Sequence, residues 1–477
     1  MTKNERQLKL GLAAYGTGWD LDAWRLPDAT NAGLEDPRVI ADLAVTAERG
    51  LFDYVFVGSA LASEPTRLNR VFRWDSAVYA GHAAARTSHV GFLVTYNSSY
   101  EHPYFVARQL ATLDRFSAGR AALNVVSGVD REGGPTANFG RYPVADEESK
   151  YRRAAEFTEA VYRLLYESWD RDYLLDDRAA GTLVRPGSWH EVDISGEFFD
   201  IRGPLNVAPP VQARIPNVHV GLSEASLDYG ARYAQARFSP YFGTDAGQEH
   251  YAAQKRRVAA AGGDPERFLV LPGVTFYLAG TAREARAKHR EILDLELTEQ
   301  LPASFAAAFG LQPEEVAPDA RLRDAVEAGG LTLEQIKPAL DALEVGGGRR
   351  GAPWLRETLA DALDDGDLTF AEFFRFIQKH REGQGIFVGD PAGFADWITD
   401  RFTGRVFDGL QLFPPYHRGP ADFLVDHVVP ELQRRGVFRR EYESSVLEVN
   451  LGLRDRDEAD PGDREGLDLR DREEAAA

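Results

Sequence analysis

Eight short apolar runs, most of them followed by a segment with helical spacing, constrain the fold of this chain more than any other feature. The runs are rich in the β-branched and aromatic residues that suit buried strands. Strands that alternate with helices form parallel sheets, and eight such units favour closure into an α/β barrel, the (β/α)₈ or TIM barrel. An open doubly wound sheet usually carries a G-x-G-x-x-G turn after its first strand, which this sequence lacks. The predicted strands are Leu8–Gly16, Phe52–Val57, His89–Thr95, Ala121–Ser127, Asn217–Gly221, Arg237–Tyr241, Phe268–Leu278 and Gly409–Phe413.

Three segments do not fit the repeat, so the barrel is expected to comprise residues 1–281 and 385–453. Residues 282–384 have helical patterns only, with capping-box spacing at Thr332 and Thr369, which predicts a helical insertion between strands seven and eight. Residues 169–197 are expected to form an irregular excursion. Residues 454–477 carry 10 acidic and 5 basic side chains and almost nothing apolar, which predicts a disordered acidic tail.

Composition excludes several kinds of chemistry. The chain has no cysteine, so disulfides, thiolate nucleophiles, Cys-ligated zinc and iron–sulfur clusters are excluded. Its 55 Lys and Arg against 75 Asp and Glu give a net charge of −20, which argues against nucleic acid as a partner. No apolar run approaches the ~20 residues that span a bilayer, so no membrane association is expected. The polar start lacks a signal-peptide core, which predicts a cytoplasmic protein.

Common catalytic and metal-binding motifs are missing from the sequence. No H-E-x-x-H occurs and the ten histidines lack metal-ligand spacing, so we expect no metal site. There is no P-loop, and Gly221–Ala225 misses the last position of the G-x-S-x-G nucleophile elbow. Asp361–Glu372 imitates a calcium loop, but Leu363 stands where an oxygen ligand is needed. A helix end followed by a Thr369 cap is the better interpretation.

Polar residues gather where predicted strands end, which is where (β/α)₈ barrels carry their active sites. Tyr96–Ser99 follow the third strand, and Asn124 with Ser127 closes the fourth. Ser223 lies between the fifth strand and its helix. A serine at a helix start, with free N–H groups and the positive end of the helix dipole, suits a phosphate. It also suits an ordinary N-cap, and spacing alone leaves both interpretations open.

Longer stretches make the sequence recognisable over nearly its whole length. They resemble the bacterial-luciferase-like, FMN-dependent monooxygenases, in the subgroup that contains nitrilotriacetate, EDTA and dibenzothiophene-sulfone monooxygenases. The matching stretches include AWRLPDA (Ala23–Ala29), AERGLFDYVFV (Ala47–Val57), HPYFVARQLATLDRFSAGRAALNVVSG (His102–Gly128), FFDIRGPLNVAPPVQ (Phe198–Gln212), GLSEA (Gly221–Ala225) and DGLQLFPPY (Asp408–Tyr416).

The resemblance implies a barrel that binds reduced FMN (FMNH₂) at its strand ends, with no metal. A separate NAD(P)H:flavin reductase would deliver the flavin, which would react with O₂ to oxygenate a small organic substrate. Members of the family cleave C–N, C–S or carbon–halogen bonds or oxidise hydrocarbons. A homo-oligomer, dimer or tetramer, is expected from the family and from the prevalence of two-fold assemblies.

The resemblance also assigns residues to the flavin site. Thr95 and the loop after it, including Asn97, would lie near the isoalloxazine ring, and Asn124 would hydrogen-bond that ring. The remaining cofactor-binding candidates are Ser59 after the second strand, Asn138 and Tyr151 along the ribityl and phosphate side, and Ser223, Glu224 and Ala225 at the phosphate.

Three residues beside strand ends are candidates for proton transfer: His102, Tyr100 and Asp20. A histidine directly before a proline, as His102 is before Pro103, is more often a helix-start residue than a catalyst.

Two positions depart from the family pattern. Thr17–Asp20 stands where the family often has a His-rich turn, and Gly58 and Ser59 stand where an acidic residue usually approaches the flavin. Ser59 therefore supports one alternative, a flavin-binding protein of the same fold that has lost catalysis. A flavin-dependent reductase or dehydrogenase on the same barrel is another alternative. Oxygen consumption in the presence of a reductase separates these hypotheses.

Overall fold

The structure is a computed structural model, and its description covers most of the barrel. Most of the predicted helical insertion, including Thr332 and the run from Asp361 to Asp367, lies outside the described residues, as does the predicted tail from residue 456 onward. The described residues are 6–20, 22–62, 74–128, 135–140, 146–240, 243–295, 319–328, 368–369, 371–373, 375 and 384–455.

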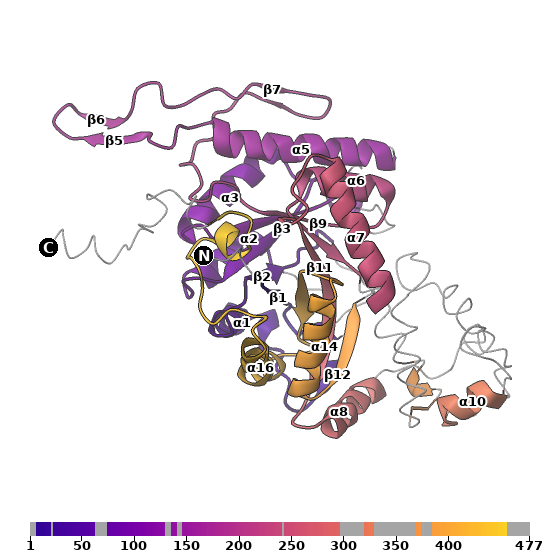
Figure 1. The fold of residues 1–477 in the computed structure, drawn as a ribbon. Helices are drawn as coiled ribbons and strands as arrows, with labels where there is room; N and C mark the ends of the chain where they lie inside the picture. The colour runs from indigo at the N-terminus through magenta and orange to yellow at the C-terminus, as the bar shows by residue number, and fades with distance from the viewer. Residues whose placement is uncertain are drawn as a thin grey trace.

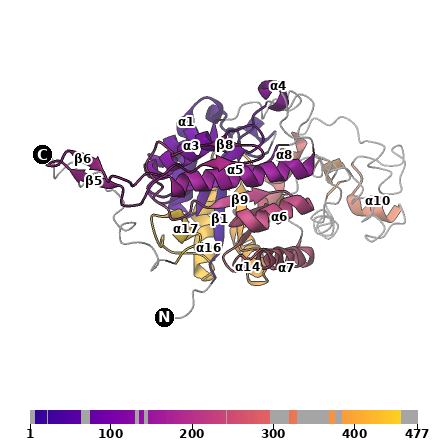
Figure 2. The ribbon, with the colours of Figure 1, turned by 90° about the horizontal axis from the view of Figure 1, so that it is seen from above.

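Eight parallel strands of the described chain form a closed barrel (Figures 1 and 2). The ring is closed where β13 pairs with β1, with Gly409 opposite Lys9, and where β10 pairs with β11. The eight predicted strands and the (β/α)₈ fold are therefore confirmed. In ring order the strands are β1 (Lys9–Ala13), β2 (Tyr54–Val57), β3 (Gly91–Asn97), β4 (Ala121–Val126), β9 (Asn217–Val220), β10 (Ala236–Ser239), β11 (Leu269–Leu278) and β13 (Gly409–Phe413).

Helices cover the outside of the barrel, and local sequence sets where they begin. Asp36, Asp75 and Asp390 each accept a hydrogen bond from a backbone N–H of the first turn, the usual N-cap arrangement. Every helix in the described residues is too short or too polar to cross a bilayer. Among the described residues the α-helices are α1 (Pro37–Arg49), α2 (Ser76–Ala84), α3 (Pro103–Phe116), α4 (Pro135–Phe139), α5 (Glu147–Glu167), α6 (Glu224–Tyr233), α7 (Thr244–Ala260), α8 (Ala282–Asp294), α10 (Leu322–Ala328), α14 (Pro391–Thr403), α15 (Pro420–Phe423), α16 (Val429–Arg434) and α17 (Leu447–Asn450).

A further strand, β12 (Gly385–Gly389), was not predicted. It pairs in parallel with the carboxyl-terminal half of β11, where Val274 lies opposite Gly385, and α14 follows it in the chain. Only the two glycines that bound this strand are fully buried. A short, half-exposed strand between glycines lacks the apolar run on which the sequence prediction depended.

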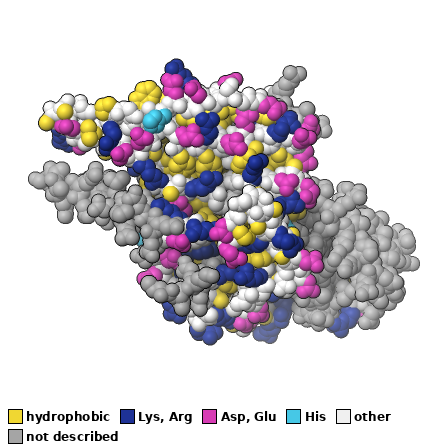
Figure 3. Space-filling view, turned by 45° about the horizontal axis from the view of Figure 1, so that its top comes forward, with side chains coloured by type: hydrophobic (Ala, Val, Ile, Leu, Met, Phe, Trp, Pro, Cys, Tyr) yellow, Lys and Arg dark blue, Asp and Glu magenta, His cyan; other side chains and the backbone are white. Residues whose placement is uncertain are grey.

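Residues 169–197, predicted to be irregular, contribute to two hairpins that we call the arm. β5 (Leu174–Asp177) pairs antiparallel with β6 (Thr182–Val184), and β7 (Ile194–Ser195) pairs with β8 (Asp200–Ile201). In Figures 1 and 2 the β5–β6 hairpin projects beyond the helices at one end of α5. Leu174 and Leu183 are exposed on this hairpin. Figure 3 shows hydrophobic side chains on the surface of the projecting segment.

Two predicted features near the insertion and the tail can be compared with the structure. Thr369 and Glu372 form the expected capping box, in which each backbone N–H donates to the other residue's side chain. At the start of the predicted tail, Arg454 pairs with Glu448 at 3.2 Å and Asp455 pairs with Arg267 at 2.7 Å. These first two residues are therefore held against the barrel.

The segment that includes α17 closes the amino-terminal end of the barrel. Leu447 and Leu451, on and just after α17, join the cluster of side chains that fills the barrel interior. A Cβ on Gly91 would come within 2.6 Å of the Leu447 side chain, so this close approach requires glycine. With this end closed, the carboxyl ends of the strands form the open end.

Replacement of Leu447 tests this closure. Leu447→Ala removes a fully buried side chain, and the cavity is expected to lower the free energy of unfolding by about 2–5 kcal/mol. Urea unfolding measures the loss. Leu183→Ala, at a position 63% exposed on the arm, serves as the control and should leave stability unchanged. Equal stability of the two variants would show that α17 does not support the barrel.

Candidate active site

Aromatic side chains line the carboxyl end of the barrel interior. Tyr15 and Trp19 follow β1, Phe56 lies near the end of β2, Phe238 is on β10 and Phe413 ends β13. The ring centroids are 5.0 Å apart for Tyr15–Trp19, 4.3 Å for Trp19–Phe413 and 5.0 Å for Phe56–Phe238. Such a surface excludes water and suits a planar, conjugated ligand.

Thr95 and Asn124 lie opposite each other on β3 and β4. The Thr95 hydroxyl donates to the Val57 carbonyl at 3.1 Å and accepts from Asn124 Nδ2 at 3.1 Å. Asn124 Oδ1 is buried and has no hydrogen-bond partner. An unsatisfied buried acceptor costs stability, and a ligand that brings an N–H to it recovers that cost. The Asn97 side chain instead accepts from the Ser99 and Gly128 amides, at 3.0 and 3.3 Å, and so shapes the β3–α3 loop.

Ser223 is the N-cap of α6, and its hydroxyl accepts from the Ser226 amide at 3.3 Å. The N-cap interpretation is therefore confirmed, and it leaves the hydroxyl proton available to donate. In the part of the chain that is described, the Glu224 and Ala225 amides have no acceptor, as the first N–H groups of a helix generally lack one within it. One hydroxyl and two amides at a positive helix end form an arrangement that suits an anion.

Buried side chains hold the turn that leads into α6, residues 221–226, in place. His219 on β9 has Nδ1 at 2.9 Å from the Val125 carbonyl, which can only accept, so Nδ1 donates. Nε2 therefore accepts from the Ser226 hydroxyl at 3.0 Å. Burial lowers the pKa of His219 to about 3, so the ring is neutral at physiological pH. Arg237 on β10 donates to Ser226 Oγ at 3.3 Å and to the Gly221 carbonyl.

Tyr151 borders the same turn. Its ring packs edge-on against His219 with centroids 6.1 Å apart. Gly221 has φ 138°, and a Cβ there would overlap Ser226 Oγ and lie 3.5 Å from the Tyr151 hydroxyl. Only glycine fits this position, which brings Tyr151 and the turn close together.

Three predicted site residues lie in the neighbouring loops. Tyr100 is 2.8 Å from Thr136 through their hydroxyl groups, and Asn138 Nδ2 donates to the Leu61 carbonyl at 2.9 Å. These contacts connect the loops that follow β2, β3 and β4. Ser59 lies just beyond Gly58 at the end of β2 and is partly exposed.

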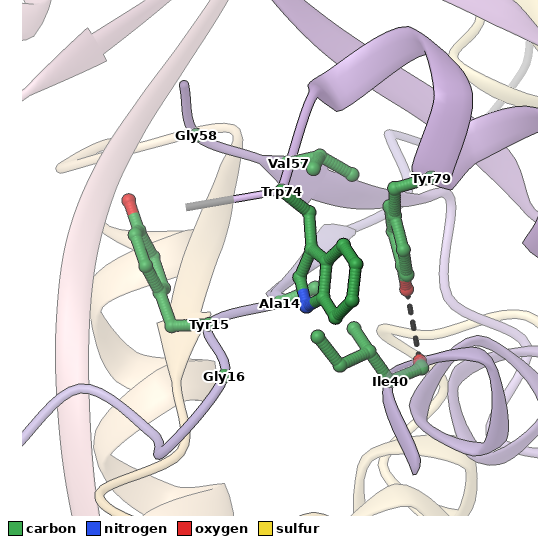
Figure 4. A pocket seen from close by; sticks show the side chains of 8 residues that line it. All are labelled: Ala14, Tyr15, Gly16, Ile40, Val57, Gly58, Trp74 and Tyr79. Carbon is green, nitrogen blue, oxygen red and sulfur yellow. Dashed lines mark hydrogen bonds between the residues drawn. The ribbon is translucent and has the colours of Figure 1, made fainter. Parts of the chain in front are cut away.

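The loops after β1 and β2 border a small pocket that is lined by Gly58, the residue before Ser59 (Figure 4). In Figure 4 the Tyr15 side chain rises beside Gly58, and Trp74 lies between the strand ends and Tyr79. Trp74 Nε1 donates to the Gly33 carbonyl at 3.0 Å, and Tyr79 donates to the Ile40 carbonyl at 2.9 Å. Gly58, one of the two residues that depart from the family pattern after β2, therefore lines this pocket.

Two candidates for proton transfer are held in structural roles. His102 is the N-cap of α3, with its ring nitrogen accepting from the Tyr104 amide at 3.3 Å. Burial and the charge of Arg153 lower the pKa of His102. Asp20 accepts from two backbone amides at 2.9 and 3.0 Å and from the Tyr277 hydroxyl at 3.1 Å. A strand-end position identified these residues but did not show where their side chains point.

Glu101 is a candidate that the sequence prediction missed. Its carboxylate accepts from the Asn97 amide inside the loop that follows β3. Burial, with a smaller contribution from the charge of Asp75, raises the pKa of Glu101 to about 7. That range suits proton transfer at neutral pH. The sequence feature that could have identified Glu101 is an acidic residue in a loop directly after a predicted strand. The described residues contain no group of three His, Asp or Glu side chains placed to hold a metal ion.

Comparison with known proteins establishes the family. The model of the luciferase-like monooxygenase family matches residues 20–401, and the chain belongs to this family. N-acetyl-S-(2-succino)cysteine monooxygenase of Bacillus subtilis (strain 168) is 31% identical over 454 residues, covering 95% of this chain and 98% of that protein. Nitrilotriacetate monooxygenase component A of Aminobacter aminovorans is 31% identical over 466 residues, covering 94% and 97%.

A solved structure agrees with this assignment. Riboflavin lyase, determined with a modified FMN and its substrate riboflavin, is 25% identical to this chain, and the two structures superpose with a TM-score of 0.75. The match covers 96% of this chain and 98% of that one. The resemblance found in the sequence is confirmed, and the protein is a flavin-dependent monooxygenase of the luciferase-like class.

The neutral His219 predicts a measurable pH dependence. Its pKa is about 3 in the folded protein against an ordinary value of 6.5, so protonation below pH 6.5 favours the unfolded chain. From pH 7 to pH 5 this group alone removes about 2 kcal/mol of stability. Urea unfolding at both pH values should show a smaller fall for His219→Gln. His82→Gln, at an exposed position on α2, should keep the wild-type fall. An identical fall in all three proteins would contradict the assignment.

Proposed function

We propose that this protein is the oxygenase component of a two-component system. It takes FMNH₂ from a separate NAD(P)H:flavin reductase and uses O₂ to oxygenate a small organic substrate. One observation carries the proposal. The backbone amides of residues 224 and 225, which have no acceptor among the described residues, and Asn124 Oδ1, which has no donor there, lie at the same end of the barrel. One relative is named nitrilotriacetate monooxygenase component A, which supports a system of more than one component.

The spacing of the two features fits one flavin. Asn124 is level with Val218 in the β4–β9 register, and the turn begins at Gly221, about 10 Å further along β9 at ~3.3 Å per residue. In the proposal the phosphate binds Ser223 and the two amides. The ribityl chain passes Tyr151, and a ring N–H reaches Asn124. The aromatic surface around Trp19 and Phe413 supports the ring and keeps water out.

The bound flavin supplies the electrons that activate O₂, and the protein supplies position and environment. Tight packing of Tyr15, Trp19 and Phe413 limits the access of water to the reacting face. Glu101 lies in the loop that follows β3, and its pKa of about 7 allows it to take up or release a proton near neutral pH.

We also propose a homo-oligomer, a dimer or tetramer. Val78 on α2 and Phe105 and Phe116 on α3 are between 63% and 75% exposed, on helices that pack against each other. Exposed apolar side chains on adjacent helices are typical of a subunit interface. A cytoplasmic location is part of the same proposal.

Oxygen uptake tests the proposed activity. With FMN, a generic flavin reductase and NAD(P)H, the protein is expected to form oxygenated products from a panel of amines, sulfones, sulfides and haloaromatics. Mass spectrometry scores the gain of oxygen or the loss of a fragment. Flavin binding with no product would favour a non-catalytic binding protein. Turnover without O₂ would favour a reductase or dehydrogenase.

Ser223→Ala tests the phosphate site. A hydrogen bond to a charged group contributes ~1.5–3 kcal/mol, so FMNH₂ binding should weaken roughly 10- to 100-fold. Reduced riboflavin, which lacks the phosphate, should bind the wild type and the variant equally. Ser223→Asp is the matched control, because it keeps an N-cap acceptor but repels phosphate, and it should discriminate against FMNH₂ as well. If both ligands weaken alike in Ser223→Ala, the residue serves only as a cap.

A further inference from the structure

Arg237 is the largest fully buried side chain among the described residues. It lies on β10 next to Phe238, which faces the barrel interior, so Arg237 points outward beneath α6. Its guanidinium donates to the Gly221 carbonyl, to Ser226 Oγ at 3.3 Å and to the Ser226 carbonyl at 3.4 Å. All three acceptors belong to the turn 221–226. Arg237 Nε has no partner.

The charge of Arg237 is not neutralised. Within the described part of the chain it forms no ion pair with a carboxylate, and the nearby Arg257 pairs with Glu224 and Asp228 instead. Burial, partly offset by Tyr151 and reinforced by Arg257, lowers the pKa of Arg237 to about 10, so it stays charged at neutral pH. A buried charge without a counter-ion is costly, so its presence needs an explanation.

A second buried arginine shows what a purely structural role looks like. Arg120, before β4, also lacks a directly bonded carboxylate among the described residues, but all of its guanidinium nitrogens are used. They donate five hydrogen bonds of 2.5–3.0 Å to Ser117, Thr87, Val90 and Ala84. Arg237 makes three hydrogen bonds within the described residues, against the five of Arg120, and leaves Nε unbonded, so hydrogen bonding satisfies it less well.

We propose that Arg237 is a positioning residue for the flavin phosphate, which holds the turn 221–226 in shape and supplies a buried positive charge behind it. This inference rests on the proposed function, because it needs the phosphate at Ser223. In a low-dielectric interior the attraction between a buried cation and a nearby dianion is strong. The bound phosphate would provide the counter-ion that Arg237 lacks among the described residues.

The hydrogen bonds show how Arg237 acts through the turn. Arg237 donates to Ser226 Oγ, and the Ser226 hydroxyl donates to His219 Nε2. The Ser226 amide donates to Ser223 Oγ, which orients the Ser223 hydroxyl so that its proton is free for an anion. Arg237 therefore holds Ser226 in place, and Ser226 orients Ser223, the residue proposed to bind the phosphate. Arg237 itself does not touch the phosphate in this proposal.

Ligand affinities under anaerobic conditions test the proposal. Kd values for FMNH₂ and reduced riboflavin are measured by flavin fluorescence for the wild type, Arg237→Met and Arg120→Met. We expect Arg237→Met to weaken FMNH₂ binding 10- to 100-fold and to leave riboflavin unchanged, while its ligand-free melting temperature stays at or above that of the wild type. Arg120→Met should melt at a lower temperature and keep the wild-type ratio of the two affinities.

Two outcomes overturn the inference and can be told apart. A wild-type preference for FMNH₂ that survives in Arg237→Met rejects the role of Arg237 alone. A wild type that binds both flavins equally rejects the phosphate site and the proposed function with it. Arg237→Lys keeps the charge without the planar fork, so it should retain most of the preference. This second variant keeps the test decisive if Arg237→Met does not fold.

Discussion

Closure of the parallel barrel is the constraint on which the rest of the structure depends. β1 and β13 come from opposite ends of the described chain, yet they pair side by side. Gly409 makes this contact feasible, because a Cβ there would overlap the Lys9 carbonyl. Closure brings every strand's carboxyl end to one rim, so Asn124 and the turn 221–226 face the same opening. A flavin site built from residues far apart in sequence follows from that geometry.

Buried charged side chains have different partners at the two ends of the barrel. At the amino-terminal end Arg439 pairs with Asp53 at 2.5 Å, and Lys9 donates to the Asn450 carbonyl at 2.7 Å. These bonds hold the final segment of the chain against the barrel floor. Nearer the carboxyl rim, Arg237 has no counter-ion among the described residues and Asn124 Oδ1 has no donor. The buried guanidinium of Arg439 therefore has a carboxylate partner at one end, whereas that of Arg237, within the described part of the chain, has none at the other, where the binding site is proposed.

Much of this fold could be predicted from the sequence, because each barrel strand is a short run of β-branched and aromatic residues next to an amphipathic helix. β12 was missed because it is half exposed, and the arm was missed because its short strands carry no strong alternating pattern. In the site, the helix start at Ser223 was predictable from its residue type. Arg237 was not, because a charged residue in a short strand gives no sign that its guanidinium is fully buried. The sequence also could not show side-chain direction, which distinguishes His102 and Asp20, whose side chains accept from nearby backbone amides at turns and helix starts, from Glu101.

The central claim is that one flavin spans the rim from Asn124 to the turn at Ser223. A crystal structure of the protein with FMN bound tests this most directly. The account predicts phosphate oxygens within hydrogen-bonding distance of Ser223 Oγ and the amides of Glu224 and Ala225, with a ring N–H directed at Asn124 Oδ1. A phosphate bound elsewhere on the barrel, with the turn at Ser223 unchanged and unliganded, would contradict it.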